Sequence, residues 1–338
     1  MFKNNRYPII GIRSKNELAK RISGKKLPYP EALYLVNDVL TNYNKYWRDN
    51  KKASDPVNDK YVRSAFGTPL GRLLDLINKK VLSPYDKLLP GFIFGGVSKK
   101  NHIQASLYLL GRRRKRTKLG ADISKFFEQN KKERVAYFLN GKCECSKKAS
   151  EIISNLCCIP LGPKNSGSSE KAIARGFATS TRLATWCNLD LFLRVDWVVK
   201  KMLKGHDPRI TFFVDDIGIS ASDVDEKLMI SVYNRIDDIF KNYDKNHGLP
   251  LNHKKRNIQS YKDGKIEHLG LRCGRNKVMI GSKTSKKLSN VKKGLSKDNL
   301  SKIEKKNLVF KVKSYNKYKS YIHKLNLANL STTHPRTK

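Results

Sequence analysis

The chain has 338 residues, of which 70 are Lys or Arg and 29 are Asp or Glu, so its formal net charge is +41. Self-repulsion of that size weakens folding unless a polyanion offsets it, and nucleic acid is the partner that such a charge predicts. Because 39% of the residues are hydrophobic, a disordered basic tail is excluded, and the charge belongs to the surface of a folded protein.

The composition also bears on the cell compartment. No apolar run approaches the roughly 20 residues that span a bilayer, and the N-terminal segment lacks the apolar stretch of a signal peptide. We therefore expect a cytoplasmic protein without membrane contact. The cysteines lack paired C-x₂₋₄-C spacing, which favours reduced thiols, with a zinc site as the minor alternative. The candidate zinc ligands are Cys143, Cys145, Cys157 and Cys158.

Hydrophobic periodicity and the positions of proline predict the elements in chain order. The expected helices occupy residues 17–23, 30–49, 68–84, 124–140, about 170 onward, and 225–245. The expected strands and strand-like turns occupy residues 118–123, 212–220, 247–259, 267–273 and 277–282. Ser124 is the expected N-cap of the helix at 124–140, and Pro84 ends the helix at 68–84.

Two basic segments lie between and after these elements. Residues 112–116 read RRRKR, which is either a solvated charge run or an RNA contact, and the net charge favours contact. From Lys283 to the end, 16 basic residues face 2 acids, which marks a separate C-terminal module. In that module Tyr315, Tyr318 and Tyr321 lie three apart between lysines. Such a stripe suits either a track along a nucleic acid backbone or packing against the protein core.

The stretch FFVDDIGIS at 212–220 places Asp215 and Asp216 in an otherwise apolar, β-prone run. It predicts a hairpin with the acids at its turn, where Asp-Asp without glycine is a strained choice. Asp122 ends the strand expected at 118–123, and the three carboxylates meet if that strand lies beside the hairpin. Three carboxylates repel one another unless a dication offsets them, and Mg²⁺ prefers oxygen ligands. A surface turn whose acids face water is the alternative.

The order of these segments along the chain resembles the reverse transcriptase family, and most closely the compact bacterial group that includes retron and phage-defence enzymes. FVDDI at 213–217 resembles the Tyr-x-Asp-Asp box of that family, and GADISKFF at 120–127 resembles its first carboxylate motif. The resemblance covers about residues 58–282. The other segments that carry it are YVRSAFGTPLGRLLDLI at 61–77, GFIFGGVSKKN at 91–101, IPLGPKNSG at 159–167, GLPLNHKKR at 248–256 and HLGL at 268–271.

The resemblance implies a catalytic site that holds two Mg²⁺ ions. Its carboxylates would be Asp122, Asp215 and Asp216, and Ile123 would offer its backbone carbonyl to metal. Two such ions lower the pKa of an attacking hydroxyl and stabilise the leaving pyrophosphate oxygen, which is what in-line phosphoryl transfer needs.

The resemblance also implies a nucleotide-binding set. Its members are Arg63, Phe127, Gly162, Ser166 and Lys255. Arg63 would clamp the triphosphate, and Phe127 would lie beneath the sugar and exclude a 2′-hydroxyl, with a core position as its alternative. Lys255, or its neighbour Lys254, would approach the leaving pyrophosphate. Gly162 and Ser166 would let the loop backbone approach the template and nucleotide closely.

The implied fold is α+β, a right-hand polymerase whose antiparallel palm sheet carries the catalytic acids. The basic helical fingers would occupy residues 1–118, the palm 119–282 and the basic helical thumb 283–338. A part of the fingers or a loop insert would lie near residues 140–160, within the palm segment.

We therefore expect an RNA-directed DNA polymerase that makes cDNA from a dedicated noncoding RNA in a bacterial retron or anti-phage defence system. Its partners would be the RNA template, the RNA/DNA hybrid and dNTPs, with an effector protein as a further candidate. One alternative is untemplated or protein-primed DNA synthesis, which the departures Leu161 and Gly167 in the 159–167 loop permit. The other is a catalytically idle RNA-binding scaffold, against which the intact acids argue.

Overall fold

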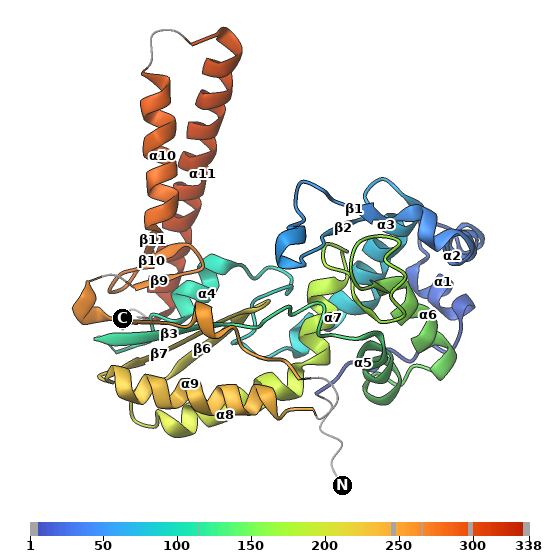
Figure 1. Ribbon diagram of the computed structural model, residues 1–338, viewed down its shortest axis with the longest axis horizontal. Coiled ribbons are helices and arrows are strands. Elements are labelled where there is room, and N and C mark those ends of the chain that lie inside the picture. The colour runs from blue at the N-terminus through green and yellow to red at the C-terminus, as the bar shows by residue number, and fades with distance from the viewer. Residues whose placement is uncertain (1–5, 114, 245–247, 265, 297–299, 334–338) are drawn as a thin grey trace. The chain divides into compact units, whose positions relative to one another are not determined.

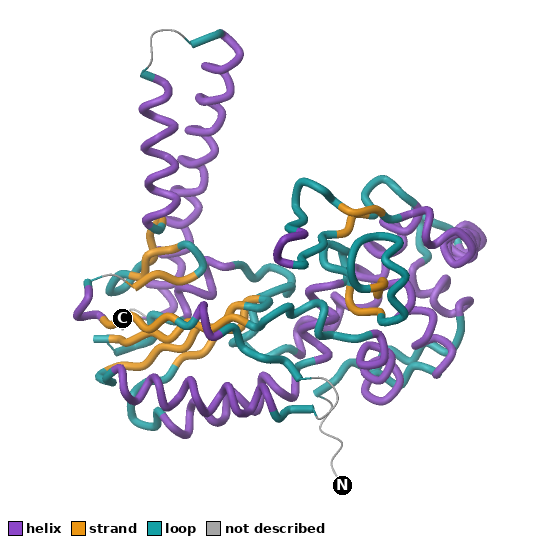
Figure 2. The backbone as a smooth tube through the Cα atoms, viewed as in Figure 1, coloured by secondary structure: helices purple, strands orange, loops and turns teal. Residues whose placement is uncertain are grey.

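The computed structural model describes residues 6–113, 115–244, 248–264, 266–296 and 300–333. Contacts within the chain separate it into two compact units, each of which combines helices with antiparallel strands (Figure 2). Unit 1 comprises Met1–Lys99, Ile123–Arg194 and Ile239–Leu251, and unit 2 comprises Lys100–Asp122, Val195–Asp238 and Asn252–Lys338. The units alternate along the sequence, whereas the sequence predicts three consecutive segments. The assignment of those segments as fingers, palm and thumb stays a prediction.

Unit 1 is mainly helical, and it confirms the helix expected at 17–23. The helix expected at 30–49 ends at Asn42, since residues 48–49 form a strand, and the helix expected at 68–84 continues beyond Leu76 only as π and 3₁₀ segments. Its helices are α1 Lys15–Ile22, α2 Tyr29–Asn42, α3 Pro69–Leu76, α5 Lys132–Tyr137, α6 Lys147–Cys157, α7 Ser180–Cys187 and the first part of α8 Leu189–Met202. Short 3₁₀ or π segments are η1 Tyr43–Tyr46, η2 Pro56–Asn58, η3 Ile77–Leu82, η4 Ser83–Leu88 and η5 Phe138–Lys142. Two antiparallel ladders pair β1 Arg48–Asp49 with β2 Arg63–Ser64, and β4 Cys158–Pro160 with β5 Lys171–Ile173.

The helix expected at 124–140 begins later than the sequence predicts. Residues 124–130 form turns, and α5 starts at Lys132. Ser124 does not cap the helix, because the helix starts eight residues later, with Lys131 at its N-cap. The Ser124 N–H donates to the Pro250 carbonyl at 2.9 Å. The next residue, Lys125, has a φ of 45°, which is incompatible with the right-handed helix.

The long helix expected from about Glu170 is also wrong. Residues 171–173 form β5, which pairs with β4, so the backbone there bonds across a ladder. Helical structure starts only at Ser180 with α7. The helix was predicted because this part of the chain has a long run without proline. Over residues 171–173, however, pairing with β4 competes with helix formation.

Unit 2 is built on a four-stranded antiparallel sheet with the strand order β6-β7-β3-β8 (Figure 1). Its strands are β3 Arg116–Asp122, β6 Arg209–Phe213, β7 Asp216–Ser222 and β8 Asn257–Ser260. One face carries the buried side chains of Leu119, Ile210, Phe212, Ile217 and Ile219. Figure 1 shows α8 and α9 Glu226–Lys241 running along this sheet. Because side chains alternate along a strand, residues 118, 120 and 122 lie on the opposite face.

β6 and β7 form the hairpin that FFVDDIGIS predicts. Phe213 pairs with Asp216, so the two-residue turn consists of Val214 and Asp215, and Asp216 is the first residue of β7. Val214 has a φ of 63°. Two-residue hairpin turns favour glycine at such a position, and a β-branched residue there is an outlier. The expected strain is confirmed, but it lies at Val214 and not at the Asp-Asp pair.

The basic run at 112–116 is partly structural. Arg116 is buried and forms an ion pair with Asp207 at 2.8 Å. The backbone N–H groups of Arg112 and Arg113 donate to the same carboxylate, at 2.7 and 3.1 Å. The RNA contact predicted for this run therefore does not apply to Arg116, whose guanidinium fixes the entry to β3. Arg114 lies outside the described residues.

α4 His102–Tyr108 links the C-terminal elements to the core of unit 2. These elements are β9 Ile266–His268, β10 Leu271–Cys273, β11 Val278–Ile280, α10 Ser282–Leu295 and α11 Lys302–Thr333, and Figure 1 shows α10 and α11 side by side. One buried cluster joins them. It contains Ile103, Leu107, Leu110, Leu271, Val278 and Ile322. Of the predicted C-terminal charges, Lys297, Asp298, Arg336 and Lys338 lie outside the described residues.

Two tyrosines of α11 bond to the first turn of α4. The Tyr318 hydroxyl lies 2.7 Å from His102 Nε2, and the two rings stack with centroids 5.9 Å apart. The Asn101 side-chain amide donates to the Tyr321 hydroxyl at 3.1 Å. For Tyr318 the packing alternative therefore holds, and a role of this stripe along nucleic acid stays a prediction. No helix in the described ranges is long and apolar enough to cross a membrane.

Replacing Val214 with glycine should stabilise the folded chain. A non-glycine residue held in a rare backbone region costs about 1–3 kcal/mol, whereas glycine loses about 0.5–1 kcal/mol more backbone entropy on folding. We expect denaturant unfolding to show a gain of about 1 kcal/mol for Val214→Gly. Val214→Ala, which keeps a side chain at the same φ, is the control. If glycine is no better than alanine, the turn is not strained at this position.

Candidate active site

Three acidic residues lie together where two paired strands end. β3 and β7 pair in a register that sets Asp122 directly opposite Asp216. Residues paired in this way carry their side chains on one face, with Cβ atoms about 5 Å apart. Asp215 is the turn residue next to Asp216. The expected proximity of strand and hairpin is confirmed, and the catalytic role of the three acids stays a prediction.

A lysine already contacts this acidic group. Lys255, in the 3₁₀ segment η6 His253–Lys255, donates to both carboxylate oxygens of Asp122 at 3.0 Å. The backbone fixes its position, because Asn252 N–H donates to the Asp122 carbonyl and Lys255 N–H donates to Asn252. Of the two lysines that the sequence leaves open, Lys255 is therefore the one that reaches the acids. Partial burial acts to lower its pKa, but the bond to Asp122 and the neighbouring charges outweigh this and raise it.

Among the three acids, Asp216 has an ionised form that the folded chain disfavours. Burial, together with the negative charges of Asp215 and Asp122, raises the pKa of Asp216 to about 6, against the weaker opposite effects of Lys255 and Lys118. The protein's own cations therefore do not fully offset the clustered carboxylates. A raised carboxyl pKa of this origin is typical of sites that receive a cation or exchange a proton.

The donor chemistry fits Mg²⁺, which prefers hard carboxylate and carbonyl oxygens. Within the described ranges, however, no group of three or more Asp, Glu, His or Cys side chains is already arranged to hold a metal ion. Lys255 is one physical reason, since its ammonium engages both oxygens of Asp122. A metal at Asp122 would have to displace this ammonium, which can turn away because the Lys255 side chain is 60% exposed.

Ile123, whose carbonyl is a predicted metal ligand, lies in a short backbone pairing. Ile123 forms an isolated antiparallel bridge with Leu251. The hydrogen bonds of this bridge run from Ser124 N–H to Pro250 and from Asn252 N–H to Asp122. The Ile123 carbonyl is thus not used by the bridge, while its side chain is buried.

Lys118 is a residue near the acids that sequence reasoning missed. It lies on the same face of β3 as Asp122 and is only 6% exposed. Burial lowers its pKa, with Cys273, Asp216 and Glu267 acting in the opposite direction. The signal was a lysine four positions before Asp122, which an alternating strand places on the same face, but residues 118–123 were interpreted only as a strand.

The predicted nucleotide-binding residues other than Lys255 belong to unit 1, whereas the three acids belong to unit 2. Arg63 is buried there between the rings of Trp47 and Tyr61, 5.4 and 5.3 Å from their centroids. Its guanidinium pairs with Asp49 and donates to the Gly162 carbonyl. Burial lowers the pKa of Arg63, although Asp49 opposes this effect. The structure therefore ties Arg63 to the loop that holds Gly162.

That loop is a tight turn closed by a serine. Gly162 has a φ of +79°, and a Cβ at this position would lie 3.1 Å from Ser166 Cβ. Ser166 Oγ donates to the Leu161 carbonyl at 2.5 Å. Glycine is required at such a turn because of its positive φ and the close approach. The structure thus brings Arg63, Gly162 and Ser166 together.

Phe127 is mostly buried, but one face of its ring meets a cation. The Arg175 guanidinium lies 5.0 Å from the ring centroid and pairs with Glu128 at 2.9 Å. Arg63, Gly162 and Arg175 line a cavity of about 240 Å³, together with Lys125 and Lys131. The three additional cations around this cavity are each paired with an acid, and no sequence motif marks them.

The cysteines do not form a metal site in the described part of the chain. Cys143, Cys145, Cys157 and Cys158 are buried and unbridged. Burial raises the pKa of each of these thiols. They act as small apolar core residues there.

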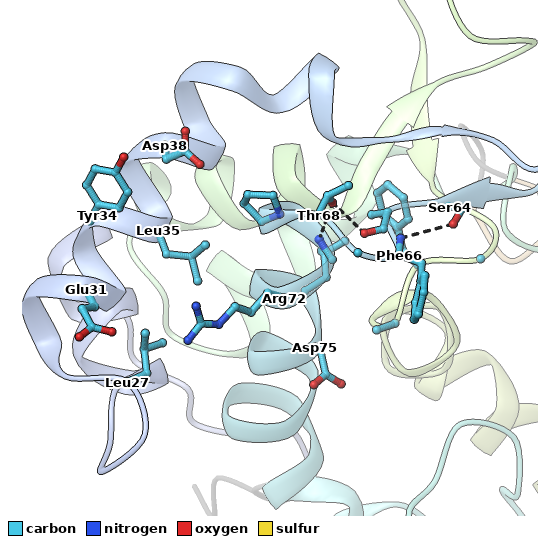
Figure 3. A pocket seen from close by; sticks show the side chains of 18 of the residues that line it. Leu27, Glu31, Tyr34, Leu35, Asp38, Ser64, Phe66, Thr68, Arg72 and Asp75 are labelled. Carbon is cyan, nitrogen blue, oxygen red and sulfur yellow. Dashed lines mark hydrogen bonds between the residues drawn. The ribbon is translucent and has the colours of Figure 1, made fainter.

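A larger hollow in unit 1 carries none of the predicted residues. It has a volume of about 1100 Å³ and lies between α2 and the start of α3. Figure 3 shows Tyr34 and Asp38 of α2 on one side and Arg72 and Asp75 of α3 on the other. Its lining is mostly apolar, and Phe66 at its rim is 88% exposed. None of the three acids and no residue of the loop at 159–167 lines this hollow.

Comparisons with known proteins include a distant structural likeness. No protein-family model matches the chain, and no curated protein matches it. Among solved structures, the chain is similar to telomerase from Candida albicans in complex with the TWJ fragment of telomeric RNA, at 12% identity and a TM-score of 0.43. The match covers 78% of this chain and 50% of that chain, so the chain spans half the telomerase length. A likeness of this size assigns neither family nor activity.

Asp216→Asn should stabilise the fold at neutral pH. The folded-state pKa of Asp216, about 6, lies above its ordinary value of 3.8, so folding disfavours the ionised form that prevails at pH 7. Asparagine removes this cost. As pH falls through about 6, folded Asp216 binds a proton first, and the advantage of the variant should shrink and vanish near pH 4. Unfolding curves at several pH values measure the difference.

The exposed Asp223→Asn variant is the matched control for this experiment. It removes one carboxylate from the same strand region, outside the acidic group. A stability gain for Asp216→Asn that does not change with pH would contradict the raised pKa.

Proposed function

We propose that this chain is an RNA-directed DNA polymerase that transfers nucleotides with two Mg²⁺ ions. The observation that carries the proposal is the register of β3 and β7, which sets Asp122 against Asp216 with Asp215 at the adjoining turn and Lys255 on Asp122. Asp122, Asp215 and Asp216, with the Ile123 carbonyl, would hold the metal ions. Such a concentration of carboxylates suits a cation-dependent phosphoryl transfer better than a passive scaffold.

The reaction joins the 3′-oxygen of a primer to the α-phosphorus of a dNTP, while the bond from that phosphorus to pyrophosphate breaks. Bound Mg²⁺ supplies a lowered pKa for the attacking hydroxyl and charge neutralisation for the leaving group. Lys255 remains protonated at neutral pH because its pKa is raised. On leaving Asp122, its ammonium can donate a hydrogen bond and a proton to the departing pyrophosphate oxygen.

The residues of unit 1 would select and orient the nucleotide. Arg63 would contact the triphosphate, and Phe127 would lie beneath the sugar and exclude the 2′-hydroxyl. The turn of Gly162 and Ser166 would present backbone to the template and the base. The cavity that Arg63 and Gly162 both line, and the contact between these two residues, support their acting together.

The proposal extends to biological context through the sequence motifs alone. We infer a bacterial enzyme of the retron or phage-defence type that works in the cytoplasm on a dedicated noncoding RNA. Its partners would be that RNA, the growing RNA/DNA hybrid, dNTPs and an effector protein. The net charge of +41 supports a polyanionic partner.

Asp122→Asn and Asp215→Asn should each abolish Mg²⁺-dependent dNTP incorporation on a primed RNA template. The loss of a metal-held charge from phosphoryl transfer should lower the rate by about a hundredfold or more. RNA binding, measured by filter retention, should stay within about twofold, because neither acid contributes to phosphate binding. Asp223→Asn controls for the loss of one surface carboxylate. Incorporation above a few per cent of wild type in either variant refutes the site.

Four exposed lysines of α11 should contribute to hybrid binding. They are Lys311, Lys313, Lys317 and Lys319. If each contacts one phosphate, changing all four to glutamine should reduce the slope of log affinity against log salt by about 3–4. Products should also become shorter, because the growing duplex is held less tightly. Gel-based binding at several salt concentrations and product sizing measure both effects.

The matched control changes four exposed lysines of unit 1, namely Lys25, Lys26, Lys147 and Lys148. It alters net charge equally but leaves α11 intact. Equal slopes and product lengths in the two variants would mean that α11 serves another partner.

A further inference from the structure

Unit 2 contains a buried lysine, Lys118, whose ammonium bonds to a backbone carbonyl and to no carboxylate among the described residues. Lys118 is 6% exposed, and its ammonium, which has three donors, makes one hydrogen bond, to the Glu267 carbonyl at 2.7 Å. Within the described residues it forms no ion pair. By contrast, the buried Arg63, Arg116 and Arg182 each pair with an aspartate. A buried cation without a directly paired anion is costly, and an anion bound beside Lys118 would offset that cost.

Lys118 lines a cavity of about 530 Å³ between β3 and the β9–β10 region. This size is within the range of small-molecule sites. The lining contains several cations and no acidic side chain. Lys115 and Arg275 are exposed at it and form no ion pair within the described ranges. The cavity is therefore electrostatically suited to an anion with more than one negative charge.

The remaining walls are apolar and aromatic. Leu110 and Ile266 are among the lining residues, and Tyr261, 39% exposed, offers its ring. A simple phosphate ion would gain nothing from these walls. A ligand with a flat ring and a phosphate tail would bury the ring against Tyr261 and place its charge at the lysines.

We propose that this cavity binds a nucleoside phosphate, separate from the nucleotide set around Arg63. Lys118, Lys115 and Arg275 contact the phosphates, and the base stacks on Tyr261. The ligand is either a free nucleotide or the phosphorylated terminal nucleotide of an RNA, which share this chemistry. The site does not depend on the polymerase reaction, because none of the catalytic acids lines it.

The test uses the full chain, without magnesium and with EDTA, so that no polymerase activity is read. Photoreactive 8-azido-ATP is crosslinked and the labelled peptide is mapped by mass spectrometry. We expect the label within residues 261–275. A label confined to residues 59–63 or 125–131 would overturn the proposal.

Binding of a fluorescent ATP analogue to variants gives the second readout. Lys118→Met should weaken binding at least tenfold, and its melting temperature without ligand should be equal to or higher than wild type, because an unpaired buried charge is removed. The exposed Lys292→Met of α10 is the matched control and should change affinity less than twofold. Unchanged affinity in Lys118→Met overturns the proposal.

A double variant protects the test against misfolding of Lys118→Met. Lys115→Gln with Arg275→Gln alters two exposed side chains and should weaken binding about tenfold with an unchanged melting temperature. If it binds as wild type does, the proposal fails. Competition with 5′-phosphorylated and 5′-hydroxyl RNA hexamers then separates the sources. Selective competition by the phosphorylated RNA supports a terminal nucleotide, and competition by ATP alone supports a free one.

Discussion

The antiparallel pairing of β3 with β7 determines which side chains of unit 2 can meet. Because side chains alternate along a strand, a slip of one residue would turn Asp122 away from Asp216 and expose the apolar set. Leu119, Ile217 and Ile219 are almost completely buried, and this burial holds the register. The apolar face of the sheet thus fixes the position of the acids on the other face, although it contacts none of them.

Two glycines make room on that polar face. Gly120 and Gly218 are paired across β3 and β7. A Cβ at Gly218 would lie 2.7 Å from both His268 and Leu109, and a Cβ at Gly120 would lie 3.1 Å from the Lys118 ammonium. The missing side chains therefore let a buried histidine and a buried lysine lie directly over the sheet. Burial lowers the pKa of His268 well below its ordinary value, so this residue is neutral packing at physiological pH.

Local sequence signals were enough to predict the hairpin, the strand before Asp122 and several helices. Each of these elements is marked by its own hydrophobic periodicity and by breaker residues within a short stretch of chain. Residue spacing alone could not show the register that joins Asp122 to Asp216, since it depends on burial across distant segments. The turn position was missed by one residue because Val214 is an unfavourable turn former. Ser124 is not a cap because residues 124–130 form turns, where its N–H bonds to Pro250, 126 positions away in sequence. β5 replaced a helix because its backbone pairs with β4. The ion pairs of Arg63 with Asp49 and of Arg116 with Asp207 could not be predicted either. The sequence shows which residues are charged, but not which acid each arginine contacts in the fold.

The attachment of α11 has a mechanical consequence. The helix is held by Tyr318, Ile322 and Asn326, the last of which forms two hydrogen bonds with the backbone of Val278 at 2.9 Å. From Tyr318 back to Lys302 the helix extends about 24 Å, given its rise of about 1.5 Å per residue. Most side chains along that length are exposed, and contact with α10 is its main support. A rotation of about 10° at the anchored end would therefore displace the far end by about 4 Å, close to the rise of three helical residues. The contact of Tyr318 with His102 lies at the anchored end, so a small repacking there would move the far end of the helix by a larger distance.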